Sequence, residues 1–343
     1  MPRVLFPKQP TQKALRSLGT IYIITIDKKK KKWYFEIMSC TNPLYALRLG
    51  VINPETGKER IKVLPRRIGY DYFSLCEEHG KDNIIPLPCG KCPSCIESRS
   101  KSWALRCVLE ASLFWDNCFV TLTYNNKCCP KSLCKSDVQK FFKRLRKVHP
   151  GIRYFGCGEY GPHGTHRPHY HFIVFNYWPQ DAVFSHQTKQ GNCFYVSKEL
   201  QELWPFGFIS VTECTYAGCA YVARYCQKKL NNPDQREFTM MSLKPGIGAE
   251  YFKQHKDFIY RYDAVFGNFG KSLRQRPSRY FDKLYERCHP EDFQHLKKGR
   301  ISRASSQVVS DMLDHGMTYY EDLLKYQARI KEDKFSRLKR KDL

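Results

Sequence analysis

Residues 167–176 constrain the fold more than any other part of the sequence, because they have the pattern of one buried β-strand. The run His-Tyr-His-Phe-Ile-Val-Phe is rich in β-branched and aromatic residues and is bounded by Pro168 and Asn176. Residues two apart on a strand point to the same face, so His169 and His171 project together. The apolar residues after them would anchor this strand in the core of a sheet.

Two imidazoles on one strand face are a good start for a divalent metal site. We interpret Gly158-Glu-Tyr-Gly161 as a polar turn, from which Glu159 would add an oxygen ligand. Two alternatives stay open. Histidine pairs on strands also occur as hydrogen-bonded polar groups without a metal, and His163 and His166 would allow a zinc site in a loop instead.

Charge indicates the kind of partner. The 343 residues suffice for roughly two domains at about 150 residues each, and the hydrophobic content of 42% is enough for a genuine core. The chain has 58 Lys and Arg against 33 Asp and Glu, a net charge of +25. Such a surplus favours a polyanion, nucleic acid first. The most apolar short stretch, residues 21–26, is far shorter than the ~20 residues that cross a bilayer, so we expect no membrane partner.

Sixteen cysteines in a long chain whose residues 1–12 show no signal-peptide core favour reduced thiols or metal ligands. Cys89, Cys92 and Cys95 lie three apart in a turn rich in Pro and Gly, where their sulfurs can converge on one ion. Tetrahedral Zn²⁺ needs a fourth ligand, which Cys40 or Cys76 could supply, and we take Cys40 as the candidate. Three metal-free thiols in a basic loop are the alternative.

Residues 217–230 lack proline and predict a helix. Tyr221 and Tyr225 are four residues apart, so they lie on one helix face with Cβ atoms roughly 5–6 Å apart. Each is followed three residues later by a cation, Arg224 and Lys228. A tyrosine pair packed in a core leaves these cations unexplained, whereas two phenol nucleophiles facing a phosphodiester use them to neutralise phosphate charge.

Three further segments have clear patterns. Residues 119–124 alternate apolar and hydroxyl-bearing side chains and predict a strand. Residues 96–113 and the segment from Ser136 to the stop at Pro150 predict basic helices, and we expect these to line a groove for single-stranded DNA. The candidate DNA-binding residues are Arg99, Lys101, Arg106, Lys143, Arg144, Arg146 and Lys147. Residues 319–338 predict a C-terminal helix.

In combination, these motifs resemble the HUH-type rolling-circle replication initiators, most closely those of microviruses of the gokushovirus branch. The resemblance is carried by Phe-Val-Thr-Leu-Thr-Tyr at 119–124, Cys-Gly-Glu-Tyr-Gly at 157–161, Arg-Pro-His-Tyr-His at 167–171 and Tyr-Val-Ala-Arg-Tyr-Cys-Gln-Lys-Lys at 221–229. The Pro-Cys-Gly-Lys-Cys-x-x-Cys cluster before a basic helix is similar to that branch as well. The match spans roughly residues 85–232.

The resemblance implies an endonuclease that nicks one DNA strand at the viral origin and later religates it. It implies that the two histidines and Glu159 hold Mg²⁺ or Mn²⁺, and that Tyr221 and Tyr225 form covalent 5′-phosphotyrosine linkages. Related sequences often have Lys where Arg224 stands. Arg keeps the charge but cannot exchange a proton at ordinary pH, which disfavours an acid–base role at this position, whereas Lys228 keeps that option.

The implied fold is α+β, an HUH nuclease core with a central antiparallel sheet flanked by helices. We expect a basic extension at residues 1–37, a Cys-rich, candidate zinc-binding region at 38–110, the nuclease core at 111–235 and a helical, basic region at 236–343. Expected partners are single-stranded and supercoiled viral origin DNA, a host helicase and a host DNA polymerase, in the cytoplasm of a bacterial host.

Rival interpretations remain. A zinc-stapled nucleic-acid-binding protein without catalysis would explain the charge, the aromatic residues and the cysteines. Other HUH enzymes are nearer rivals, but the paired tyrosines disfavour single-tyrosine transposases, and the chain is too short to carry the helicase of a large relaxase.

Overall fold

The computed structural model describes residues 40–54, 59–65, 72–161, 166–225, 237–268 and 272–341. Contacts divide the chain into two compact units. The first unit is formed by residues up to Cys95 and from Gln294 onward, and the second by Ile96–Phe293. The basic extension expected at residues 1–37 lies outside the described residues.

The first unit has a three-stranded antiparallel sheet in the order β2-β1-β3. Its elements are β1 (Leu44–Ile52), β2 (Glu59–Val63), α2 (Tyr72–His79), the 3₁₀ helix η1 (Lys81–Asn83), β3 (Ile84–Leu87), most of α9 (Pro290–Asp314) and α10 (Tyr320–Lys341). Helix α10 confirms the C-terminal helix predicted for residues 319–338.

The second unit is built on a seven-stranded antiparallel sheet in the order β10-β5-β6-β4-β9-β8-β7. Its strands are β4 (Asn117–Tyr124), β5 (Arg153–Tyr160), β6 (Pro168–Phe175), β7 (Val183–Gln187), β8 (Cys193–Val196), β9 (Gly207–Glu213) and β10 (Phe238–Met241). This central antiparallel sheet with helices around it confirms the α+β prediction. The predicted strands at 119–124 and 169–175 are β4 and β6.

Most of the helices that the structure describes belong to the second unit. They are α3 (Pro93–Ala111), whose first turn belongs to the first unit, α4 (Lys135–Val148), α5 (Lys198–Leu203), α6 (Tyr216–Tyr225), α7 (Ala249–Tyr262) and α8 (Arg279–Cys288). A small hairpin joins β11 (Val265–Asn268) to β12 (Ser272–Gln275). In the described part of the chain, every helix is too short or too polar to cross a membrane.

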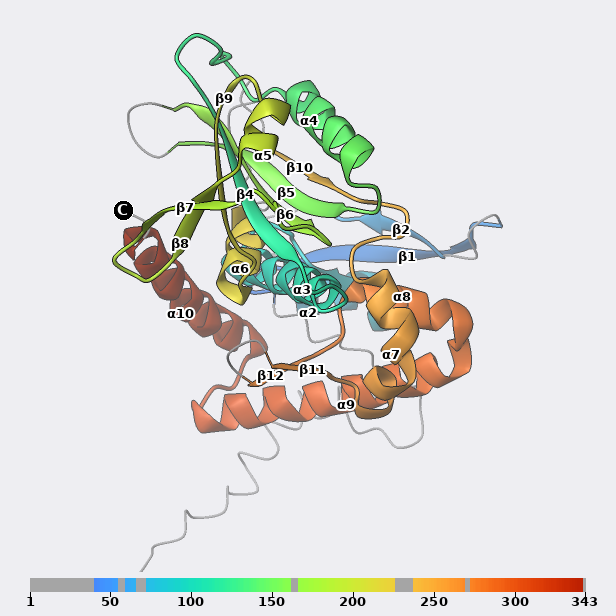
Figure 1. Ribbon diagram of the computed structural model, residues 1–343. Helices are drawn as coiled ribbons and strands as arrows, with labels where there is room; N and C mark the ends of the chain where they lie inside the picture. The colour runs from blue at the N-terminus through green and yellow to red at the C-terminus, as the bar shows by residue number, and fades with distance from the viewer. Residues whose placement is uncertain are drawn as a thin grey trace, which may run out of the picture. The chain divides into compact units, whose positions relative to one another are not determined.

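Side-chain alternation gives the central sheet two different faces. On one face, buried residues such as Leu122 and Phe172 pack with Phe141 and Phe142 of α4. On the other, Phe155 and Ile173 pack with residues of α3 and α6, among them Val108 and Val222. The sheet therefore separates α4 from α3 and α6, as Figure 1 shows.

The polar turn predicted at residues 158–161 is wrong, because β5 continues as a strand to Tyr160. Two glycines explain the difference. A Cβ at Gly156 would lie 2.2 Å from Phe172 Cδ1, and one at Gly158 would lie 2.9 Å from Tyr170 Cδ1. These glycines therefore leave room for two large rings of β6, so glycine here marks close strand packing rather than a turn.

The sheet also extends beyond the nuclease core expected at residues 111–235. Strand β10 pairs with β5 from Phe238 opposite Gly158 to Met241 opposite Phe155. The pattern of a four-residue edge strand is too short to be recognised in the sequence.

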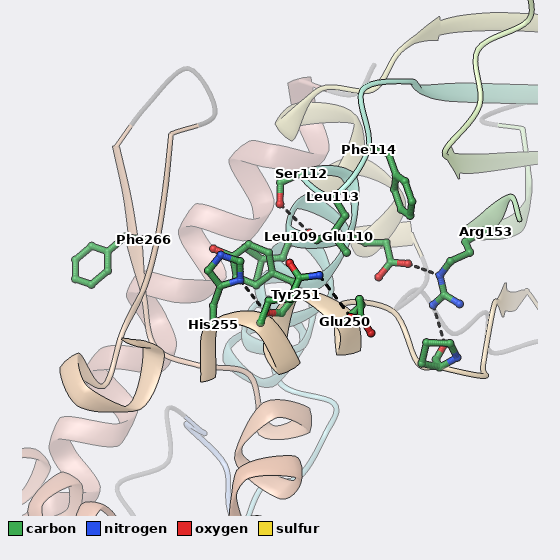
Figure 2. A pocket seen from close by; sticks show the side chains of 12 residues that line it. Leu109, Glu110, Ser112, Leu113, Phe114, Arg153, Glu250, Tyr251, His255 and Phe266 are labelled. Atoms are coloured by element: carbon green, nitrogen blue, oxygen red, sulfur yellow. Dashed lines mark hydrogen bonds and ion pairs between the residues drawn. The ribbon is translucent and has the colours of Figure 1, made fainter. Parts of the chain in front are cut away.

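A buried ion pair joins α3 to β5 in the second unit (Figure 2). Glu110 has a side chain 2% exposed and accepts from the Arg153 guanidinium, while its Oε2 accepts from the Gly248 backbone N–H at 2.6 Å. Arg153 also donates to the Pro245 carbonyl at 2.7 Å. Both charges line a cavity of about 760 Å³ beside α7.

Replacing Glu110 by Ala should lower the free energy of unfolding by about 3–5 kcal/mol, since Arg153 and the Gly248 N–H then lose a buried acceptor. The control is Lys101→Ala, which breaks an exposed pair with Glu97 and should cost at most about 1 kcal/mol. Urea unfolding followed by circular dichroism measures both variants. Equal small losses would contradict this account of the ion pair.

Candidate metal centre

Two neighbouring strands bring a carboxylate and two imidazoles together. Glu159 of β5 pairs directly with His169 of β6, and His171 follows two residues later on the same strand. Cross-strand partners and residues two apart share a sheet face, so the three side chains converge. The Nε2 atoms of both histidines lie 3.0 Å from Glu159 Oε1. The predicted ligand set therefore forms one cluster.

The cluster is largely removed from solvent, and burial and charge act against each other in it. Burial opposes ionisation of Glu159, but hydrogen bonds and charge from both histidines outweigh it and lower its pKa to about 2. At His169, burial favours the neutral ring, but contact with Glu159 raises the pKa. At the more buried His171, burial prevails and lowers the pKa. The site thus holds an anionic carboxylate between two imidazoles.

The outer hydrogen bonds orient both rings as metal ligands. His169 Nδ1 lies 3.2 Å from the Arg167 carbonyl oxygen, which can only accept, so Nδ1 donates, and Nε2, which faces Glu159, is the nitrogen that would bind a metal in place of its proton. His171 Nδ1 lies 3.0 Å from the Thr121 hydroxyl. Such partners on the far nitrogen are typical of metal-binding histidines.

One buried oxygen of Glu159 indicates that a cation fits this cluster. Glu159 is 3% exposed, and its Oε2 atom has no hydrogen-bond partner among the described residues. A buried carboxylate oxygen without a partner is costly, and a divalent cation would satisfy it. The ligand atoms of the three side chains lie within 4.8 Å of one another. The cluster therefore suits a metal ion.

Helix α6 brings Tyr221 to the same cluster. The Tyr221 hydroxyl donates to Glu159 Oε1 at 3.3 Å, and its ring meets the His171 ring edge-on at 5.4 Å between centroids. The helix approaches the sheet closely at Gly218, where a Cβ would lie 3.2 Å from the Phe119 ring. One predicted tyrosine is thus in contact with the metal-ligand set.

The remaining residues of the tyrosine motif are described only in part. Arg224 is half-buried near the end of α6. Tyr225 is the last residue of that helix, and its side chain lies outside the described part of the structure, as does Lys228 entirely.

The prediction that both basic helices line one DNA groove is wrong, because α3 and α4 pack on opposite faces of the central sheet. Helix α4, with Lys143, Arg144, Arg146 and Lys147, packs on the face opposite the metal cluster. Arg144 donates to the Leu203 carbonyl at 2.6 Å, and Arg146 to the Ser242 hydroxyl at 3.0 Å. Only α3, with the exposed Arg99 and Lys101, belongs to the side of the cluster.

Arg106, which the sequence predicts as a DNA contact, is buried between two aromatic rings. It is 8% exposed, and its guanidinium lies 4.0 Å from the ring centroids of both Trp103 and Tyr280. Its Nε donates to the Ile247 carbonyl at 2.9 Å. A basic pattern on a helix does not distinguish a solvent-facing arginine from one stacked between aromatic rings.

The structure adds residues that the motifs did not single out. Thr121 orients His171, and Thr123 pairs with His169 on one side and with the exposed Phe208 on the other. The carboxylate of Glu237 also contributes to the raised pKa of His169. Alternation in residues 119–124 could have placed both threonines on one face, but the strand register was needed to place them beside histidine.

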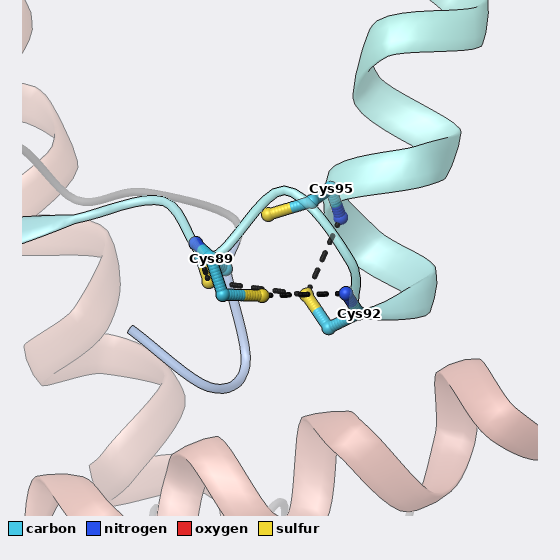
Figure 3. Close-up of side chains that lie close together, drawn as sticks. Cys89, Cys92 and Cys95 are labelled. Carbon is cyan, nitrogen blue, oxygen red and sulfur yellow. Dashed lines mark hydrogen bonds between the residues drawn. The ribbon is translucent and has the colours of Figure 1, made fainter. Parts of the chain in front are cut away.

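The four predicted zinc ligands Cys40, Cys89, Cys92 and Cys95 gather in a second cluster, within the first unit. Figure 3 shows how Cys89, Cys92 and Cys95 lie in it. Cys76, the alternative fourth ligand, instead packs against Tyr72, Leu75 and Ile84.

Changing His171 to Ala should weaken Mn²⁺ binding to the carboxylate–histidine cluster by about 10-fold or more, because one of three ligands is lost. His186, an exposed histidine of β7, provides the control, and His186→Ala should bind Mn²⁺ like the wild type. Titration followed by the electron paramagnetic resonance signal of free Mn²⁺ measures both. Unchanged binding in the His171 variant would contradict the assignment.

Comparison with known proteins places the whole cluster in one family region. The family model for replication-associated protein ORF2/G2P matches residues 117–230, which include both histidines, Glu159 and the tyrosine motif. The chain is 30% identical to replication-associated protein ORF2 of Spiroplasma virus 4, covering 71% of this chain and 82% of the relative. No solved structure shows significant similarity to it.

Two further relatives are also replication-associated proteins of phages. Replication-associated protein VP4 of Bdellovibrio phage phiMH2K is 30% identical, over 74% of this chain and 89% of the relative. Replication-associated protein ORF4 of Chlamydia phage 1 is 31% identical, over 71% of this chain and 65% of the relative. The chain belongs to the family of gokushovirus-like replication-associated proteins.

Proposed function

We propose that this protein is a metal-dependent endonuclease and strand transferase that nicks one strand of DNA at a viral origin to start rolling-circle replication. The observation that supports the proposal is the 3.3 Å contact between the Tyr221 hydroxyl and Glu159, because a nucleophilic tyrosine would have to lie beside the candidate metal ligands in this way. HUH-type initiators, which the motifs resemble, combine the same groups.

Glu159, His169 and His171 would hold Mg²⁺ or Mn²⁺, a hard or borderline cation suited to one carboxylate and two imidazoles. When bound, such an ion acts as a Lewis acid on a phosphodiester and stabilises the charge that develops in the transition state. The chain's own residues orient the metal ligands and the nucleophile. Thr121 and the Arg167 carbonyl fix the two rings, and α6 holds Tyr221 beside them.

In the proposed reaction the Tyr221 oxygen attacks the phosphorus of the scissile phosphodiester. A bond forms between this oxygen and phosphorus, and the bond from phosphorus to the 3′ oxygen breaks. The phenol gives up its proton and the departing 3′ oxygen gains one, which leaves a 5′-phosphotyrosine and a free 3′-hydroxyl. Lys228 is the residue of this motif that could exchange that proton.

Rejoining reverses this step, because a 3′-hydroxyl attacks the phosphotyrosine and releases the tyrosine. The bond energy is kept in the linkage, so no nucleotide cofactor is consumed. We propose that Tyr225 makes the second cut when the origin is regenerated. A host DNA polymerase would extend the free 3′ end and a host helicase would unwind the duplex, in the cytoplasm of the bacterial host.

On the metal side of the central sheet, the exposed start of β9 offers a path for the bases next to the cut. Phe208 of β9 is 67% exposed and pairs with Thr123, which in turn pairs with His169. These three residues share one sheet face, and two strand spacings put Phe208 about 10 Å from His169. An exposed ring at this distance is suited to stack on a base of single-stranded DNA, while Arg99 and Lys101 would contact phosphates.

Tyr221→Phe, Tyr225→Phe and the double variant test the nucleophiles. Incubated with single-stranded origin DNA, labelled on a base 3′ to the cut site, and Mn²⁺, the wild type should give a covalent adduct that denaturing gels resolve. We expect all variants to bind this DNA and only the double variant to lose the adduct completely. Loss in one single variant would leave an enzyme but remove the alternating mechanism.

Tight binding of a verified origin with no adduct in the wild type would overturn the nuclease proposal. That outcome would favour a protein that binds nucleic acid without catalysis.

Phe208→Ala should weaken binding of single-stranded DNA by roughly 5- to 100-fold, since one base loses a stacking partner. Phe184 of β7 gives a matched control, because it is 56% exposed and pairs with Tyr195, whose ring packs on the α4 side of the sheet. Phe184→Ala should bind like the wild type. Fluorescence anisotropy with a labelled oligonucleotide measures both, and equal effects would exclude the proposed path.

A further inference from the structure

The second cysteine cluster joins two segments of the first unit that are far apart in sequence. Cys40 lies shortly before β1, whereas Cys89, Cys92 and Cys95 lie where β3 gives way to α3 (Figure 3). All four Sγ atoms lie within 4.8 Å of one another. None of the four forms a disulfide.

Backbone amides point at these sulfurs. The Cys89 N–H donates to Cys40 Sγ at 3.3 Å, and the Cys92 N–H donates to Cys89 Sγ at the same distance. The Lys91 N–H also lies 3.5 Å from Cys89 Sγ. Hydrogen-bond donors aimed at sulfur stabilise a thiolate more than a thiol, because the thiolate is the stronger acceptor. The loop is therefore shaped to receive anionic sulfurs.

Cys92 has a further role at the start of α3. The helix begins at Pro93, and the Cys95 N–H donates to Cys92 Sγ at 3.4 Å. This is the geometry of a helix cap, with sulfur in place of the usual side-chain oxygen and proline at the first helical position. Partial positive charge at a helix N-terminus favours an anion there.

The sulfur spacing matches a tetrahedral ion rather than a disulfide. Four sulfurs placed about 2.3 Å from a zinc ion are roughly 3.8 Å apart. Cys40 Sγ and Cys92 Sγ are 3.8 Å apart. A disulfide would require about 2.0 Å.

The surrounding fold has few other means of stabilisation. Among the described residues near β1 to β3, the buried members of the apolar cluster are Tyr72, Leu75 and Ile84, to which β1 adds the small side chain of Ala46. Small units with so little apolar core commonly need a disulfide or a metal ion. Cys40 and Cys95 are themselves buried, at 2% and 8% exposed.

We propose that Cys40, Cys89, Cys92 and Cys95 form a structural zinc site that ties the segment before β1 to the start of α3. Four protein sulfurs fill a tetrahedral shell and leave no position for water or substrate, so the site is structural and not catalytic. Zinc has no redox chemistry, so it suits a site that only stabilises the fold. Iron is the alternative ion for a tetrahedral set of four thiolates. The proposal does not depend on the nuclease activity.

The wild-type full-length protein allows a direct test. Metal analysis after purification without chelators should find one tightly bound zinc per chain. Native alkylation with iodoacetamide, read by peptide mass spectrometry, should spare the four cysteines and modify the exposed Cys128 and Cys288. After a strong chelator the four should react as well. Equal reactivity before and after chelation, or iron in place of zinc, would overturn the proposal.

Variants distinguish this site from the carboxylate–histidine cluster. Cys40→Ser should lose one equivalent of zinc, whereas Cys76→Ser, a matched change within the same unit, should keep it. His171→Ala should also keep the cysteine-bound zinc. The proposal fails if Cys40→Ser retains all its zinc, or if the zinc disappears with His171 instead.

Discussion

The antiparallel register between β5 and β6 is the constraint on which the candidate active site depends. It sets Glu159 opposite His169, and the two-residue period of the strand brings His171 to the same face. A slip of one residue would turn both imidazoles toward α4. Large buried rings oppose such a slip, because Tyr170 and Phe172 fill the core on the α4 side above two glycines of β5. The residues that stabilise the sheet therefore also position the metal ligands.

Alternation along the strands divides stability from chemistry. In β4, Val120 and Leu122 are fully buried against the α4 side, whereas Thr121 and Thr123 belong to the metal side. On that side α6 packs through Val222 and holds Tyr221 against Glu159. The zinc site that we propose lies in the other unit, where Tyr72, Leu75 and Ile84 form a small apolar cluster.

Local patterns were sufficient to predict the two central strands, the histidine pair and the contact-forming tyrosine. They failed where the outcome depends on partners distant in sequence. Gly158 has a turn-like signature, yet its role is to admit the Tyr170 ring. Arg106 has the pattern of a DNA contact, but it is stacked between Trp103 and an aromatic residue far along the chain. Which sheet face α4 covers likewise follows from packing and not from its charge.

The most direct test of the central claim is to identify the residue that carries DNA in the covalent complex. Trypsin cleaves after Arg224, so Tyr221 and Tyr225 fall in different peptides. The complex formed with origin DNA and Mn²⁺ is digested with nuclease and trypsin and analysed by mass spectrometry. Our account predicts a nucleotide on the Tyr221 peptide, with a second population on the Tyr225 peptide. A nucleotide on any other residue, or on none, would contradict it.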